Sequence, residues 1–299
     1  MCRIKYLLLL TALIIMGCQV SEQDDSLIEK RKNKVKEVAY QRAFKVGVMP
    51  TMDCLPIFLL KDSALYNPDD IDIRLKEYTS QRDCDTAMIN GRVQAAVTDL
   101  VQAEYLKDEK NAVLDYMTET NATWQLMATP ASGIKQVEDL GDKVIGLAFN
   151  SVTQYLTIQV ISSHSIKNRT YGSQINDIFI RMQMLRNKQL DAVWTSEPQT
   201  TQAKILGNKE IYNSTKQDFT PGAIVFVNAP KVEKRQVFED AYNKAVDMIN
   251  KHPIQYFAPL IKKYMRVDDK VISALPNMVY KRVTPPRRRD IIKAQNAIM

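Results

Sequence analysis

Short apolar strands alternate with helices along most of the chain, and this alternation limits the possible folds more than any other feature. Residues 44–49 form an apolar strand, and residues 54–65 then show helical spacing of apolar side chains. The same order repeats until a short strand at residues 95–98, after which Asp99 opens another helix. Repeated strand–helix units indicate a mostly parallel sheet covered by helices. We therefore predict an α/β protein.

The pattern starts again in the second half of the chain. A strand is predicted at residues 143–147, followed by a helix that Ser151 caps. Asp177 begins the next helix, and residues 191–194 resemble a strand. After Pro230 the chain is helical to its end. Two α/β units in sequence, followed by a helical segment, are therefore expected.

The helix starts that follow strands are the expected place of a binding site. In open α/β sheets, ligands bind beyond the carboxyl ends of the strands, where helix N-termini point. These N-termini offer free N–H groups and the positive end of the helix dipole, so they suit anions or polar acceptor groups. Asp53 and Asp83 are placed to cap the first two helices. We expect the following residues to line the site: Met52, Asp53, Ser80, Asp99, Asn150, Ser151, Thr153 and Glu197.

The charges in this predicted site do not favour one sign. Arg181 is the nearby guanidinium suited to a carboxylate or a sulfonate. Asp53, Asp99 and Glu197 favour a cation or an amine, and Glu197 becomes the discriminating charge if the two aspartates serve as helix caps. Trp194 ends a predicted strand and either stacks on a planar ligand or packs in the core. The identity of the ligand stays open.

The N-terminus has the pattern of a secretion signal. Arg3 and Lys5 precede an apolar run at residues 6–16, which has the length of a signal-peptide core and is too short to span a bilayer. The quartet Ile15–Cys18 resembles the bacterial lipobox, in which small residues precede a cysteine that becomes lipidated. This resemblance implies that Cys18 is the lipidated N-terminus of the mature protein.

We therefore predict a lipoprotein signal peptide at residues 1–17 and a lipidated, flexible tether at residues 18–41. The tether segment contains few apolar residues, which is typical of a flexible linker. The protein is expected in the cell envelope, lipid-anchored to a membrane and facing the periplasm or the exterior.

Two further cysteines, Cys54 and Cys84, remain after the signal region. In an oxidising compartment such a pair either forms a disulfide or stays free, and only the distance between the two residues decides. A metal site is not expected, because the chain has 2 histidines, His164 and His252, neither with a partner at ligand spacing.

Composition argues against nucleic-acid binding and against an enzyme. The formal net charge is +7, but lysine and arginine are mostly scattered and form no basic face with interleaved aromatic residues. No nucleophile elbow, zinc-protease motif or phosphate-binding loop occurs, and histidine is scarce for acid–base chemistry. We predict neither a catalytic residue nor a cofactor.

Four segments resemble one known family, the solute-binding lipoproteins of ABC importers, in the branch that contains nitrate, sulfonate and thiamine-precursor binders. The resemblance covers roughly residues 44–285. In order along the chain, the segments are Val46–Pro50 with Leu55–Leu59, Asn90–Asp99, Val137–Gly146, and Met184–Ala192 with Glu197–Pro198.

The resemblance implies the two-lobed periplasmic binding protein type II fold. Each lobe is a mixed, mostly parallel sheet covered by helices, and two crossover hinge strands join the lobes near Ala128–Pro130 and near Pro221–Val225. The first lobe is expected to comprise residues 42–128 plus 226–299, and the second lobe residues 129–225. A ligand would lie in the cleft and be trapped by hinge closure.

The resemblance also implies the function and the partners. We expect a monomer that captures a small polar organic solute or an oxyanion and delivers it to ABC permease subunits, without catalysis. The alternatives are a lipid-anchored sensor or adaptor that retains the fold and, last, an enzyme on the same fold.

Overall fold

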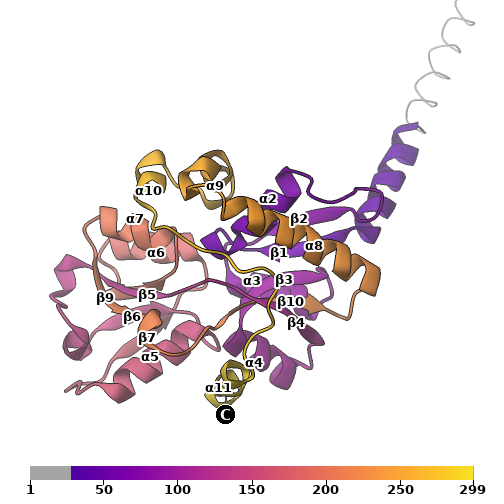
Figure 1. The fold of residues 1–299 in the computed structure, drawn as a ribbon. Coiled ribbons are helices and arrows are strands. Elements are labelled where there is room, and N and C mark those ends of the chain that lie inside the picture. Colours follow the sequence, from indigo (N-terminus) through magenta and orange to yellow (C-terminus); the bar gives the residue numbers. More distant parts are fainter. Residues whose placement is uncertain (1–27, 299) are drawn as a thin grey trace, which may run out of the picture. The chain divides into compact units, whose positions relative to one another are not determined.

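The computed structural model describes residues 28–298 (Figure 1). The predicted signal peptide and the lipidation site Cys18 lie outside the described residues. The chain divides into two compact units, one ending at Ala43 and one running from Phe44 to Met299. No helix in the described part is both long enough and apolar enough to cross a membrane.

Residues 28–42 are helical, whereas the sequence predicts a flexible tether up to residue 41. The segment is rich in lysine and also contains arginine, glutamate and glutamine, which are strong helix formers even where nothing packs against them. Pairs one turn apart add to this preference, and the Gln41 side chain donates to Glu37 Oε1 at 2.6 Å. Residues 28–42 are therefore helical although few of their side chains are apolar.

The first sheet has five strands in the order β2-β1-β3-β10-β4 (Figure 1). Strand β1 pairs in parallel with β2 and β3, whereas β10 is antiparallel to both β3 and β4. The sheet is therefore mixed and mostly parallel on one side, as expected. Its strands are β1 (Phe44–Val48), β2 (Ile73–Glu77), β3 (Ala95–Asp99), β4 (Leu114–Glu119) and β10 (Gly222–Val227).

The second sheet also has five strands, in the order β7-β6-β8-β5-β9. Strand β6 is parallel to β7 and β8, and β5 is antiparallel to β8 and β9. The outer strands β7 and β9 were not predicted, because their mostly polar residues show no clear apolar alternation. The strands are β5 (Gln125–Ala128), β6 (Val144–Leu147), β7 (Tyr171–Gln174), β8 (Ala192–Thr195) and β9 (Lys209–Asn213).

Two segments of chain cross between the sheets. The first crossover is residues 120–124, between β4 and β5, and the second is residues 214–221, between β9 and β10. Both lie a few residues before the predicted positions, so β5 belongs to the second sheet and not to the first lobe. All four residues of β5 are buried, and a strand buried on both faces carries no alternation that would assign it to a sheet.

Helices cover both sheets. We call the first sheet with its helices the first lobe and the second sheet with its helices the second lobe. The C-terminal helix α11 lies beside α4 (Figure 1), where Gln295 donates to Glu104 at 2.8 Å. The helices of the first lobe are α2 (Leu55–Asp62), α3 (Gln81–Ile89), α4 (Leu100–Lys110), α8 (Val232–Ile249), α9 (Ala258–Met265), α10 (Asp269–Ala274) and α11 (Arg288–Ile298). Those of the second lobe are α5 (Val152–Ser163), α6 (Ile178–Arg186) and α7 (Gln199–Ile205).

The two cysteines of the body are buried and free, so the disulfide considered for them is absent. Cys54 packs with Val46 on one face of the first sheet, whereas Cys84 packs with Ala96 on the other. Neighbouring residues of a strand point to opposite faces, and a Cβ at Gly47 would lie 2.8 Å from Cys84 Sγ. Strand β1 therefore separates the two sulfur atoms.

Candidate functional site

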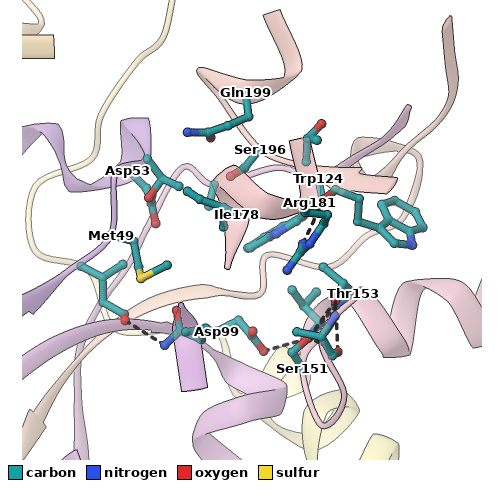
Figure 2. A pocket seen from close by; sticks show the side chains of 18 of the residues that line it. Met49, Asp53, Asp99, Trp124, Ser151, Thr153, Ile178, Arg181, Ser196 and Gln199 are labelled. Atoms are coloured by element: carbon teal, nitrogen blue, oxygen red, sulfur yellow. Dashed lines mark hydrogen bonds between the residues drawn. The ribbon is translucent and has the colours of Figure 1, made fainter. Parts of the chain in front are cut away.

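A cavity of about 90 Å³ lies between the two lobes (Figure 2). Its walls come from the carboxyl ends of β1 and β3 in the first lobe and of β6 and β8 in the second. Side chains from the first crossover complete the lining. Because the carboxyl ends of parallel strands carry the helix starts, this is the position where an α/β fold binds its ligands.

The structure brings six of the predicted residues together around this cavity. They come from both lobes: Asp53 and Asp99 from the first, and the others from the second. The predicted residues that line the cavity are Asp53, Asp99, Ser151, Thr153, Arg181 and Trp194.

Met52 and Glu197 do not line the cavity. The Met52 side chain lies in the core of the first lobe, and its backbone N–H donates to the Glu197 carbonyl at 2.9 Å. The Glu197 carboxylate accepts from the Thr201 backbone N–H at 3.1 Å, inside the first turn of α7. Glu197 is therefore used within the fold, and the discriminating charge must be sought elsewhere.

Ser80 and Asn150 also lie outside the lining. Ser80 is the cap of α3 and accepts from the Asp83 N–H at 3.4 Å, so Asp83 is inside the helix and is not its cap. Ser80 also forms an isolated bridge with Asp177 of the second lobe. Asn150 is exposed, adopts a left-handed backbone conformation with φ of 58°, and donates its N–H to Gln154.

Asp53 faces the cavity because it does not cap α2 (Figure 2). The helix begins after Cys54 without a side-chain cap, and Asp53 lies in the preceding 3₁₀ turn, Met52–Cys54. Its side chain is 7% exposed, accepts from the Thr120 hydroxyl at 3.4 Å, and forms no ion pair with any other described residue. Burial raises the pKa of this carboxyl, and the Thr51 hydroxyl opposes the shift.

Asp99 joins the two lobes. Its Oδ1 accepts from the Gln102 N–H at 2.9 Å, which caps α4, and from the Val152 N–H at 3.0 Å, at the start of α5 in the other lobe. The side chain is 6% exposed, and burial raises its pKa to about 7. One carboxylate oxygen thus accepts hydrogen bonds from the N-termini of two helices, one in each lobe.

Arg181 projects from α6 into the cavity (Figure 2). Its Nε and Nη2 donate to the Ile175 carbonyl at 3.0 and 2.7 Å, and Nη1 donates to the Trp194 carbonyl at 3.1 Å. It forms no ion pair within the described chain, and burial lowers its pKa to about 10. The guanidinium therefore stays charged at neutral pH and retains N–H groups beyond those three bonds.

The helix starts around the cavity are already capped by the protein itself. Ser80 caps α3, Asp99 caps α4, Ser151 accepts from the Thr153 N–H at 3.2 Å in α5, and Asp177 caps α6. From the sequence, we expect these N–H groups to contact a ligand. Their occupation by side-chain oxygens removes the main reason to expect an anion at the helix N-termini.

The two tryptophans differ from one another. The Trp194 side chain is 1% exposed, donates its Nε1–H to the Thr157 hydroxyl at 2.8 Å, and packs edge-on against Tyr212. It supports the cavity wall as part of the core of the second lobe. Trp124 lies in the first crossover, is half-buried, and lines the same cavity. Sequence reasoning did not select Trp124.

Sequence reasoning also missed Thr98. Its side chain is 4% exposed and lines the cavity, and its hydroxyl is a buried polar atom with no hydrogen-bond partner in the described part of the chain. Its place at the end of β3, next to Asp99, is the signal that could have identified it.

The lobes contact each other around the cavity. Gln199 of α7 donates from Nε2 to the Pro50 carbonyl at 2.9 Å, and the Ile178 N–H donates to the Thr79 carbonyl at 2.9 Å. Together with the Asp99–Val152 bond, these contacts hold the lobes in a closed arrangement.

Within residues 28–298, no group of three or more histidine, cysteine, aspartate or glutamate side chains is arranged to hold a metal ion.

The fold is that of known solute-binding proteins. The ligand-binding component of an ABC-type import system from Staphylococcus aureus, solved with zinc bound, is 14% identical with a TM-score of 0.72, over 86% of this chain and 91% of that one. The alkanesulfonate-binding protein of Xanthomonas axonopodis pv. citri, bound to MOPS, is 16% identical with a TM-score of 0.69, over 86% and 91%. The nitrate-binding protein of Synechocystis PCC 6803 is 10% identical with a TM-score of 0.66, over 78% and 69%.

These similarities confirm the predicted two-lobed periplasmic binding protein fold. No curated protein matches the sequence. The family described as NMT1/THI5 like matches residues 51–255, which is more than half of the chain and includes most of the cavity lining. The resemblance inferred from the four sequence segments is thereby confirmed, and the chain belongs to the NMT1/THI5-like family.

Proposed function

We propose that this protein binds a small solute in the cavity between its lobes and delivers it to an ABC importer. The observation that carries the proposal is the cavity itself, which lies between the two lobes and is lined by buried polar side chains from both. Family membership supports the proposal, and so do the structural neighbours, which are described as import components or as sulfonate- and nitrate-binding proteins.

The arrangement suits binding without chemistry. Two crossover segments join the lobes, so the cavity can open and close by hinge motion. A ligand that contacts both lobes favours the closed state, because it interacts with that state more strongly than with the open one. The permease would then distinguish the two shapes.

The N-terminal sequence supports the location that this function requires. We propose that Cys18 is lipidated and that the chain preceding it is removed, so that the protein works as a monomer in the cell envelope, tethered to a membrane. The lipobox-like quartet Ile15–Cys18 supports this part of the proposal.

Native mass spectrometry of protein purified without a denaturing step tests the binding function. We expect one small molecule per chain, released on denaturation, and a monomeric mass. The variant Ala148→Leu fills part of the cavity and should lose the adduct, whereas Ala131→Leu, at an exposed position, should keep it. The proposal is contradicted if wild-type protein carries no adduct and no small molecule raises its unfolding temperature in a broad screen.

A further inference from the structure

Opposite charges face the cavity from the two lobes, and neither forms an ion pair with a described residue. Asp53 belongs to the first lobe and Arg181 to the second. Figure 2 shows them on opposite sides of the cavity. Both side chains are at least nine-tenths buried, and neither forms an ion pair with another residue of the described chain. Buried charges are normally paired, because an unpaired charge in a low-dielectric site costs several kcal/mol.

The surroundings of Asp53 call for a positive group. Its hydrogen bonds come from hydroxyls and nearby backbone, with the Thr120 hydroxyl at a long 3.4 Å. The Thr98 hydroxyl is buried, has no hydrogen-bond partner among residues 28–298, lines the same cavity and can accept a hydrogen bond. These oxygens make the lobe-one wall rich in acceptors, which suits a ligand group with several N–H donors.

The surroundings of Arg181 call for a negative group. Three of its N–H groups bond to two backbone carbonyls, and the others are left for a ligand. The nearest carboxylate along the chain is Asp177, which caps α6 through the Phe179 and Ile180 N–H groups and accepts from the Thr79 hydroxyl. Burial lowers the Arg181 pKa and the Asp177 charge opposes this shift, but the Asp177 carboxylate is hydrogen-bonded within the fold and forms no ion pair with the guanidinium in the described chain.

We propose that the ligand is a small zwitterion whose protonated nitrogen contacts Asp53 and whose carboxylate or sulfonate contacts Arg181. This inference rests on the proposed function and narrows its ligand class. A simple oxyanion would leave Asp53 unpaired and would find the helix N-termini capped by Ser80, Asp99 and Ser151. A simple cation would leave Arg181 unpaired.

Two further features agree with a zwitterion. The cavity of about 90 Å³ is smaller than the ~150 Å³ cavity that accommodates benzene, and a ligand with few non-hydrogen atoms suits it. A ligand with one charge for each lobe also couples binding to closure, because both ion pairs form only when the lobes meet around it.

Isothermal titration calorimetry on the whole protein, first freed of any bound solute by dialysis, tests the inference. The probes are glycine, β-alanine, γ-aminobutyrate and their sulfonate counterparts, which vary the spacing between the two charges. Propylamine, propionate and propane sulfonate each carry one charge alone. At least one zwitterion should bind, and the single-charge probes of matched length should bind about 30-fold more weakly or not at all.

Variants of Asp53 and Arg181 test which lobe binds which charge of the ligand. Asp53→Asn should lower the affinity for the zwitterion about 30-fold or more. The variant should then bind the zwitterion no more tightly than the probe that carries only a negative charge. Arg181→Lys, which keeps the charge, should retain more affinity than Arg181→Gln, and thermal unfolding shows whether each variant is folded. Asp69→Asn, which removes an exposed carboxylate outside the cavity lining, should change nothing.

Failure of this inference differs from failure of the proposed function. If propionate or propane sulfonate binds as tightly as every zwitterion, or if Asp53→Asn leaves zwitterion affinity unchanged, the zwitterion assignment is wrong. It is equally wrong if no zwitterion binds, or if native mass spectrometry finds a solute that lacks one of the charges. In that last case a bound solute still supports the binding function itself.

Discussion

At the scale of single residues, burial determines the charge state of the cavity. Asp99 has its pKa raised to about 7, and so does Asp85 of α3, which is buried and feels the Asp99 charge. Burial raises the pKa of Tyr116 in β4, its hydrogen bond to Glu104 adds to the shift, and the charge of Asp99 contributes least. In the folded state the Asp99 and Asp85 carboxyls therefore hold protons at a pH where the unfolded chain has released them.

The sign of the resulting pH dependence follows from that difference. Since the folded state binds more protons between about pH 4 and pH 7, stability falls as pH rises through this window. Each group contributes a slope of up to about 1.4 kcal/mol per pH unit. Asp99→Asn keeps an oxygen for the Gln102 and Val152 N–H groups, so it should flatten the dependence without loss of the helix cap.

Urea unfolding of wild type and variant between about pH 5 and pH 8 measures this. Asp85→Asn is the matched comparison, because it removes the neighbouring buried carboxyl and leaves the contact between the lobes in place. A wild-type stability that rises across this range would contradict the prediction.

A second residue-scale prediction concerns Gly47 in β1. A Cβ at this position would lie 2.8 Å from Cys84 Sγ and 3.3 Å from the Ala96 Cβ, closer than packed atoms tolerate. Gly47→Ala should therefore lower the free energy of unfolding by about 1–3 kcal/mol. Chemical denaturation of both single variants and the double variant with Cys84→Ala measures the coupling. If the double variant is no more stable than the sum of the single effects predicts, the contact with Cys84 is not the cause.

At the scale of secondary-structure elements, the caps show what a sequence can and cannot reveal. Ser151, Asp99 and Asp177 cap the predicted helices, because short polar side chains before an apolar run are local signals. The same logic predicts Asp53 and Asp83 as caps, whereas Ser80 caps α3 and α2 follows Cys54 without a side-chain cap. Local pattern finds the helix but not its first residue.

Pairing between strands that are distant in the sequence explains the remaining differences between prediction and structure. Strands β7 and β9 are outer strands whose polar residues carry little pattern, and β5 is assigned to its sheet only by its neighbours β8 and β9. The site was predicted at the strand ends because topology alone locates it there. That Glu197 and Met52 are used inside the fold depends on tertiary contacts that no local pattern reports.

An element-scale prediction follows from the cap of α5. Ser151 accepts from the Thr153 N–H, so Ser151→Ala should lower the free energy of unfolding by about 0.5–2 kcal/mol. Ser162→Ala, near the exposed end of the same helix, is the control and should have a smaller effect. Guanidinium unfolding followed by circular dichroism compares them, and equal effects would contradict a specific role for the cap.

At the scale of the whole molecule, the bonds between lobes set the balance between closed and open states. Gln199→Ala removes the bond to the Pro50 carbonyl, which is worth about 1 kcal/mol. The ligand-free protein should then be more expanded in small-angle X-ray scattering, and apparent affinity should fall by up to about fivefold. Gln202→Ala, on the same helix but outside the cavity lining, serves as the control. Unchanged scattering in Gln199→Ala would show that this bond does not hold the lobes together.

The starts of α4 and α5 share the Asp99 carboxylate. This arrangement also affects whether inorganic anions from the medium bind at these helices. Phosphate and sulfate are the ions that helix N-termini ordinarily attract. Here both N-termini already end on an oxygen that is part of the chain and cannot be washed away. The protein itself therefore occupies these two N-termini, and phosphate or sulfate from the medium does not compete there with a scarce solute.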